Sequence, residues 1–135
     1  REINKYIKAL ALDYVQLHGK PSLQALKKLH TPVIQVFRGT PSESTVRKFL
    51  RSVDFILIDK ADKKGKADYK KIASLPSDLR SKLFVAGGVK PSNVQYVVKT
   101  IQPYAIDCAS GIELKRQPGK KSAVRMSSLI HKVKS

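Results

Sequence analysis

The sequence predicts an α/β protein in which short parallel strands alternate with helices. Short apolar, β-branched runs recur along the chain, and segments with helical spacing of apolar residues separate them. Runs that are apolar on both faces suit strands buried in a parallel sheet. An apolar share of 41% allows a packed core, and 135 residues allow one ordinary domain.

The expected strands each end in a polar residue or a glycine. His18-Gly19 follows the first strand and Gly87-Gly88 follows the fourth. Such residues end a strand because they favour turns over continued extension. The five expected strands cover residues 14–17, 33–37, 55–58, 83–85 and 105–108.

Helices are expected before, between and after these strands. The expected helices carry apolar stripes within residues 3–11, 23–29, 46–53, 94–101 and 126–133, and several follow Ser or Pro start signals. Residues 68–81 predict only a short helix, because Pro76 interrupts a sparse stripe. The alternation fits two architectures, an open doubly wound sheet or a piece of a (β/α)-barrel.

The charge balance is the strongest feature of the composition. There are 27 Lys and Arg residues against 10 Asp and Glu, which gives a net charge of +17. This excess favours a polyanionic partner, usually nucleic acid. No apolar run is long enough for a membrane span, and the single Cys108 excludes an internal disulfide. No metal site and no cofactor are expected. Because the chain opens with Arg1 and not with Met, we expect either that an upstream segment was removed or that the chain is part of a longer one.

Two pairs of residues at strand ends are candidates for binding phosphate. Gly87 and Gly88 follow the fourth strand, and Ser110 and Gly111 follow the fifth. Glycine lets backbone N–H groups approach a phosphate, and a following helix N-terminus adds positive charge. A tight turn without a ligand explains the glycines equally well.

Asp59 is the candidate acid or base, because it ends an apolar strand at the face where α/β enzymes place catalytic groups. A helix cap or an ion pair with Lys60 is the alternative. His18 could line the same face. Asp107, inside the fifth strand, is expected to be a half-buried, paired structural residue, and Cys108 a small buried apolar one.

Basic residues gather after the third and fifth strands. Clusters at one end of a sheet could contact phosphate backbones through shape and charge, without reading bases. The candidate nucleic-acid contacts are Lys60, Lys63, Lys64, Lys66, Lys70, Lys71, Lys115, Arg116, Lys120 and Lys121.

In their order along the chain, these motifs resemble the phosphoribosylanthranilate isomerase family of tryptophan biosynthesis. The resemblance rests on residues 14–19, 33–38, 53–59, 86–94, 103–113 and 118–121. That family folds as a (βα)₈ barrel and catalyses an Amadori rearrangement. The resemblance implies that residues 1–135 form a single incomplete domain, a partial (β/α)₈ TIM barrel with strands four to eight. It also implies that Asp59 is the general acid, and that the Gly87-Gly88 and Ser110-Gly111 loops bind phosphate.

The chain departs from this family in several respects. The family's general base, a cysteine in a Lys-x-Cys-Gly strand, is absent, and so is the arginine for the substrate carboxylate. The family's Gly-Gly-Ser-Gly-Lys segment is replaced by Asp62-Lys63-Lys64-Gly65-Lys66. Family members are also not usually this basic.

The missing base and the charge together favour a degenerate barrel that serves as an RNA-contacting subunit of a ribonucleoprotein, for instance in a mitochondrial or plastid ribosome. Five parallel strands cannot close a barrel, so another chain or a missing N-terminal segment is expected to cover the open sheet edges. The alternative is a true isomerase of which this chain is the C-terminal portion. A remnant that binds a phosphoribosyl ligand without catalysis is a third option. All three imply an intracellular protein.

Overall fold

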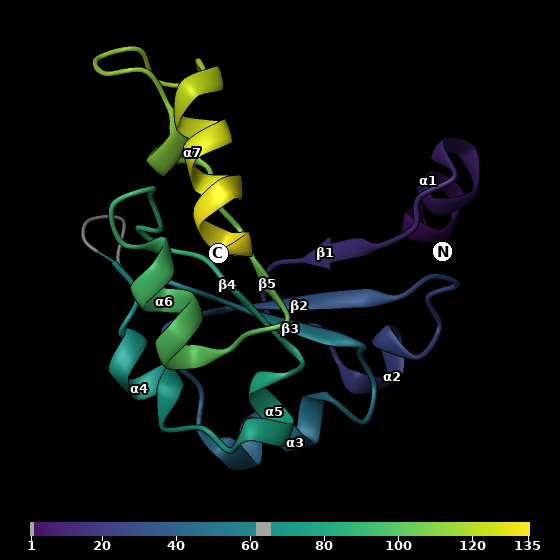
Figure 1. Ribbon diagram of the computed structural model, residues 1–135. Helices are drawn as coiled ribbons and strands as arrows, with labels where there is room; N and C mark the ends of the chain where they lie inside the picture. The colour runs from purple at the N-terminus through teal and green to yellow at the C-terminus, as the bar shows by residue number, and fades with distance from the viewer. Residues whose placement is uncertain (1, 62–65) are drawn as a thin grey trace.

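A computed structural model describes residues 2–61 and 66–135 (Figure 1). Five strands form one parallel sheet: β1 (Val15–Leu17), β2 (Val33–Arg38), β3 (Phe55–Asp59), β4 (Leu83–Val85) and β5 (Ala105–Ile106). All five predicted strands are confirmed, with ends that shift by one or two residues. The fifth is the shortest because the backbone turns at Ala109 into the short 3₁₀ helix η1 (Ser110–Ile112).

Helices precede, connect and follow the strands, as the alternation predicts. They are α1 (Glu2–Leu10), α2 (Leu23–Leu26), α3 (Glu43–Phe49), α4 (Tyr69–Ala73), α5 (Ser77–Arg80), α6 (Val94–Ile101) and α7 (Ala123–Lys134). The weak stretch before the fourth strand contains two short helices instead of one, because Pro76 begins the second. Ser22 and Ser42 cap α2 and α3 by accepting backbone N–H groups.

The order of the strands decides between the two architectures. Neighbouring strands in the sheet follow the order of the chain, β1-β2-β3-β4-β5. A doubly wound sheet reverses its strand order at a switch point, whereas the strands of a barrel follow one another around the axis. The doubly wound alternative is therefore wrong, and the sheet has the barrel type of winding.

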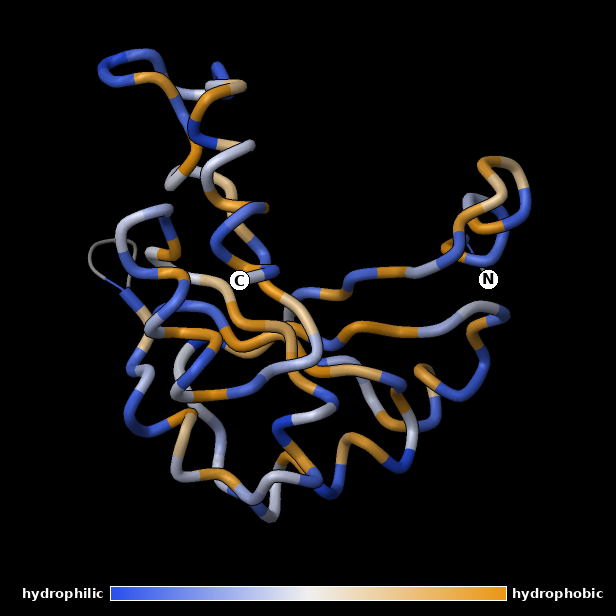
Figure 2. The backbone as a smooth tube through the Cα atoms, in the orientation of Figure 1, coloured by the Kyte–Doolittle hydropathy of each residue, from blue (hydrophilic) through white to orange (hydrophobic). Residues whose placement is uncertain are grey.

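The two faces of the sheet are packed differently. Helices α2 to α6 cover one face (Figure 1), where the large apolar core includes Ile56, Ile58, Leu83 and Val85. The opposite, concave face holds a smaller cluster around Val36 and Leu57. The hydropathy colouring shows the apolar strands between more polar connections (Figure 2).

The first and last helices lie at opposite ends of the sheet, α1 beyond β1 and α7 beside α6 (Figure 1). Both carry exposed apolar side chains, among them Tyr6 and Leu10 on α1, and Val124 and Ile130 on α7. Within the described parts of the chain, β1 and β5 each pair along one edge only. No helix in these parts is long and apolar enough to cross a membrane.

Candidate active site

Asp59 lies at the carboxyl end of β3, as its place in the sequence predicts. Its backbone pairs with Arg38 at the end of β2, and its side chain is half-buried. The Oδ1 atom accepts the backbone N–H of Lys60 at 2.7 Å. This hydrogen bond holds the carboxylate at the end of the sheet, where barrel enzymes carry their catalytic groups.

Gly87 brings the loop after β4 against Asp59. Gly87 and Gly88 both have a φ of +80°, in the left-handed region that favours glycine. A Cβ atom added to Gly87 would lie 2.6 Å from the Lys60 nitrogen and 2.9 Å from Asp59 Oδ1. Glycine is therefore required both for the turn and for this close approach.

The carbonyl groups of this glycine loop are held by neighbouring residues. Gly87 O accepts the Tyr69 hydroxyl at 2.9 Å and the Ala67 N–H at 3.0 Å. Gly88 O accepts Asn93 Nδ2 at 3.0 Å. In a trans peptide the C=O and the following N–H point in opposite directions. The N–H groups of Gly88 and Val89 consequently point away from these partners, as a phosphate-binding loop requires.

The loop after β5 packs directly on the first loop. A Cβ atom on Gly111 would overlap the carbonyl oxygen of Val89, so only glycine fits there. The Cys108 thiol donates to the same Val89 oxygen at 3.0 Å. Ser110 and Gly111 begin η1, which places the start of this helix beside the glycine loop.

The two loops and Asp59 line one cavity of about 290 Å³. All five predicted site residues, Asp59, Gly87, Gly88, Ser110 and Gly111, border it. The cavity also contains two carboxylates that sequence reasoning did not assign to the site, Asp107 and Glu113. The candidate acid Asp59 and a candidate phosphate cradle therefore face the same space.

Asp107 differs from its expected role. It is exposed, it lies just past the end of β5, and within the described residues its side chain forms no ion pair. The expectation of a paired structural aspartate is wrong because the strand ends at Ile106, which leaves the side chain in the cavity.

Two ionisable groups in the cavity have shifted pKa values. Burial raises the pKa of the Cys108 thiol, and the negative charge of Asp107 raises it further. The Lys121 ammonium, 2.9 Å from Glu113 Oε1, lowers the pKa of that carboxyl. Cys108 is only partly buried, where a small buried apolar residue was expected, and it packs against the large apolar core.

His18 lies at the same end of the sheet but borders a different cavity. That cavity is lined by Lys20, Phe37, Arg38 and Phe49. Among the described residues, no group of His, Cys, Asp and Glu side chains is arranged to hold a metal ion.

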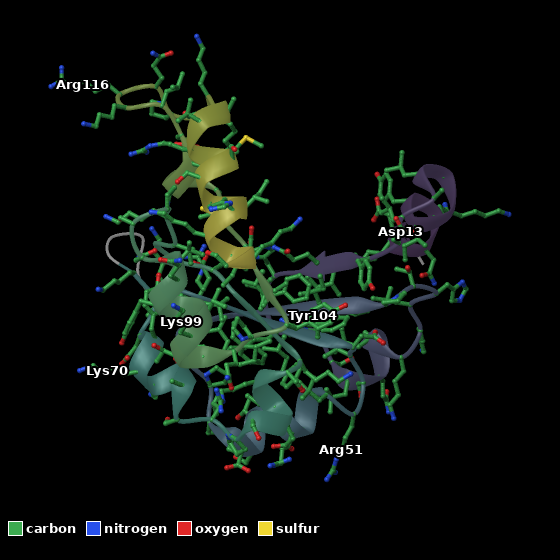
Figure 3. All side chains as sticks on the ribbon, viewed as in Figure 1. Asp13, Arg51, Lys70, Lys99, Tyr104 and Arg116 are labelled. Carbon is green, nitrogen blue, oxygen red and sulfur yellow. The ribbon has the colours of Figure 1, made fainter. Side chains whose placement is uncertain are left out.

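The candidate nucleic-acid residues do not form one patch. Lys60 lines the Asp59 cavity, and Lys121 is occupied because its Nζ donates to Ala109 O and to Glu113. Lys70 on α4 and Arg116 beyond η1 lie far apart (Figure 3). Lys66 and Lys71 are exposed near α4, and Lys115 and Lys120 lie in the loop with Arg116. Lys63 and Lys64 lie outside the described residues.

Sequence reasoning missed the residues that hold the glycine loop in place. Tyr69 lies in a stretch of sequence without a recognisable motif. Asn93 is recognisable from the sequence only as a residue near the start of a helix. Asn93 ends up as a brace, with its Oδ1 accepting the Lys90 N–H at 2.9 Å and its Nδ2 bound to Gly88. The spacing of Gly88 and Asn93, five residues apart across a turn, could have indicated this contact.

Taken together, the winding of the sheet and the site at its carboxyl edge define an α/β protein of the barrel class, with an acid beside a candidate phosphate loop. Residues 1–132 match the family described as N-(5'phosphoribosyl)anthranilate (PRA) isomerase. The chain therefore belongs to the phosphoribosylanthranilate isomerase family.

Individual relatives agree with this assignment. The N-(5'-phosphoribosyl)anthranilate isomerase of Bacillus cereus strain AH820 is 32% identical over 98% of this chain, and that of Bacillus mycoides is 31% identical. The solved isomerase from Thermotoga maritima superposes with a TM-score of 0.76 at 28% identity and covers 98% of this chain. The chain spans 66% of the length of the curated relatives it matches and 67% of that solved structure.

These comparisons correct the main functional expectation. The chain resembles isomerases along almost its whole length, and none of the matches supports an RNA-binding subunit of a ribonucleoprotein or an organellar location. The physical reason for the error is that net charge says nothing about where the charges lie. The basic side chains are dispersed (Figure 3), and some are occupied by internal contacts.

Proposed function

We propose that this chain supplies strands four to eight of a (βα)₈ barrel that isomerises N-(5'-phosphoribosyl)anthranilate by an Amadori rearrangement in tryptophan biosynthesis. In this proposal the chain is a single incomplete barrel domain, works inside the cell, and leaves β1 and β5 as the edges at which the other strands pair. Asp59 is the general acid, and the loops at Gly87-Gly88 and Ser110-Gly111 bind the phosphate of the substrate.

The observation that carries the proposal is the contact between the acid and the phosphate loop. Asp59 Oδ1 would be 2.9 Å from a Cβ atom on Gly87, so the loop rests directly against the carboxylate. A phosphorylated sugar held by its phosphate at this loop would have its ring beside Asp59. One relative was solved in complex with reduced 1-(o-carboxyphenylamino)-1-deoxyribulose 5-phosphate, a ligand with a phosphate on a sugar chain.

The chemistry divides between an acid and a base. The acid protonates the sugar-ring oxygen as the bond between that oxygen and C1′ breaks and the nitrogen lone pair forms a C=N bond to C1′. The base then removes the proton from C2′, which gives an enolamine that tautomerises to the ketone. Asp59 is suited to the first step by its position. The base that the family resemblance implies, a cysteine on the first strand, has no counterpart among these 135 residues. The proposal therefore assigns it to a βα segment that pairs with the open edges.

Growth of a bacterial tryptophan auxotroph that lacks the isomerase tests the proposal. The full reading frame that encodes this chain is expected to restore growth without tryptophan, and Asp59→Asn is expected to abolish it. Asp13→Asn serves as the matched control, because Asp13 is an exposed residue before β1 and distant from the site (Figure 3). Absence of growth with the unchanged reading frame would contradict an isomerase. Phosphate binding that persists without growth would favour the remnant that binds a ligand without catalysis.

A further inference from the structure

The two phosphate loops have a second side, away from Asp59. There, Gly88, Ser110 and Gly111 border a groove of about 730 Å³ whose other lining residues are Lys66, Lys90, Asn93 and Arg125. The groove and the Asp59 cavity share these three loop residues and no others.

The two sides carry opposite charge. The cavity beside Asp59 is lined by one cation, Lys60, and by three carboxylates, those of Asp59, Asp107 and Glu113, of which Glu113 is paired with Lys121. The groove is lined by three cations and by no carboxylate. A dianion bound at the shared loops is repelled by the first set and attracted by the second. Charge therefore favours placement of the anion toward the groove.

The three cations lie on segments that hydrogen bonds join to the loops. Lys66 is next to Ala67, whose N–H donates to Gly87 O at 3.0 Å. The Lys90 N–H donates to Asn93 Oδ1, and the same side chain binds Gly88 O. Arg125, in the first turn of α7, donates from Nη1 to Glu113 O at 2.9 Å and is half-buried. These hydrogen bonds hold the segments that carry the three cations next to the loops.

Arg125 keeps donors available for a ligand. A guanidinium has five N–H groups, and the bond to Glu113 O uses one of them. Because this bond fixes the side chain before any ligand arrives, less side-chain entropy is lost on binding. Arg and Lys side chains are the usual partners of phosphate oxygens.

We propose that this groove is an anion site for a phosphoryl group, in which Lys66, Lys90 and Arg125 act as side-chain ligands in addition to the backbone N–H groups of the loops. The inference rests on the proposed function, because it concerns the same phosphate loops. It adds that the phosphate is recognised by charge from the groove side, by residues of the segments after β3, β4 and β5.

Calorimetric titration of the full chain with inorganic phosphate at low ionic strength tests this inference. Lys90→Gln and Arg125→Gln are each expected to weaken phosphate binding by roughly ten- to a hundredfold, the usual effect of losing one charge-assisted hydrogen bond. Lys99→Gln is the matched control, since it removes the same charge from α6 at a place outside the groove (Figure 3). Lys90 and Lys99 are both exposed, so neither substitution disturbs the core.

The results separate this inference from the proposed function. Equal affinity in Lys90→Gln, Arg125→Gln and Lys99→Gln would overturn the groove ligands, even if the loops bind phosphate. Failure of the unchanged chain to bind phosphate would overturn them as well. If the groove variants weaken phosphate binding while the reading frame does not restore growth, the inference about the groove ligands is supported and the isomerase proposal is contradicted. Competition by ribose 5-phosphate distinguishes a sugar-phosphate site from a site for free phosphate.

Discussion

At the scale of single residues, the site depends on two glycines that work for different reasons. Gly87 needs a positive φ and an absent side chain, whereas Gly111 needs only the absent side chain, because Val89 O occupies the space. The sequence alone predicted that glycines at strand ends matter, since loops at this edge carry ligands in parallel α/β folds. It could not predict the contacts that make each glycine necessary, because those contacts join segments far apart in the chain.

Gly111→Ala tests the packing of the two loops. The added methyl group must displace the Val89 backbone, so the free energy of unfolding is expected to fall by roughly 2–3 kcal/mol. Gly119→Ala is the control, because its positive φ imposes strain while nothing lies within 4 Å of the new atom, and it should cost only about 1 kcal/mol. Urea denaturation measures both, and similar losses for the two variants would argue against the close contact.

The raised pKa of the Cys108 thiol predicts slow alkylation. Only the thiolate reacts, and burial keeps the thiol protonated to higher pH than in an unfolded chain. Iodoacetamide at pH 8 should therefore modify the native protein more slowly than the same protein in urea. The rate for the native protein should still be rising at pH values where the denatured protein has reached its plateau. Identical pH profiles in the two states would contradict this.

At the scale of secondary structure, local signals in the sequence predicted where helices begin. Tertiary contacts decided what the side chain at each helix start binds. Ser22 and Ser42 each accept a backbone N–H at the start of a helix, as their positions in the sequence suggested. Ser122 caps α7 in the same way, although no start signal was assigned to that helix. The helix start at Asn93 behaves differently, because its side chain turns back to brace the glycine loop instead of capping α6. A local pattern cannot distinguish these two uses of a polar residue at the start of a helix.

The loop after β5 is fastened by an ion pair whose effect on Glu113 can be measured. Lys121 lowers the pKa of the Glu113 carboxyl, so the pair is present above the usual pKa of a glutamate and is lost as the pH falls through the depressed value. In Lys121→Gln, the midpoint of Glu113 titration by NMR should move upward toward the ordinary value. The midpoint of Asp78, which pairs with Arg47, should not move. An unchanged Glu113 midpoint would show that Lys121 does not hold this carboxylate.

Three aromatic rings, those of Phe55, Phe84 and Tyr104, contact one another across neighbouring strands. Tyr104 stacks on Phe55 with ring centroids 4.4 Å apart and contacts Phe84 at 5.6 Å, although it is 57% exposed. Tyr104→Ala should therefore lower the free energy of unfolding by roughly 1–2 kcal/mol. Tyr96→Ala is the comparison, because Tyr96 is 50% exposed and has no ring partner among the described residues. Equal effects in urea unfolding would mean that the ring contacts contribute nothing.

At the scale of the whole molecule, composition left two questions open: which architecture the sheet adopts and where the basic side chains lie. The winding of the sheet answers the first, and the distribution of charge answers the second. Periodicity predicted five parallel strands, but only the spatial order of β1 to β5 distinguishes barrel winding from a doubly wound sheet. The net charge of +17 suggested a nucleic-acid partner, and this was wrong, because a sum of charges contains no positions. Three of those charges, on Lys66, Lys90 and Arg125, line a groove beside the candidate phosphate loops.

The central claim is that Asp59 and the adjacent phosphate loops form the acid and phosphate portion of an isomerase site. The most direct test is the steady-state rate of phosphoribosylanthranilate isomerisation by the protein from the full reading frame, compared with Asp59→Asn. Removal of a general acid should lower kcat by a factor of about 100 or more, while KM changes little because the phosphate loops are intact. An Asp59→Asn variant that retains the kcat of the unchanged protein would contradict the claim.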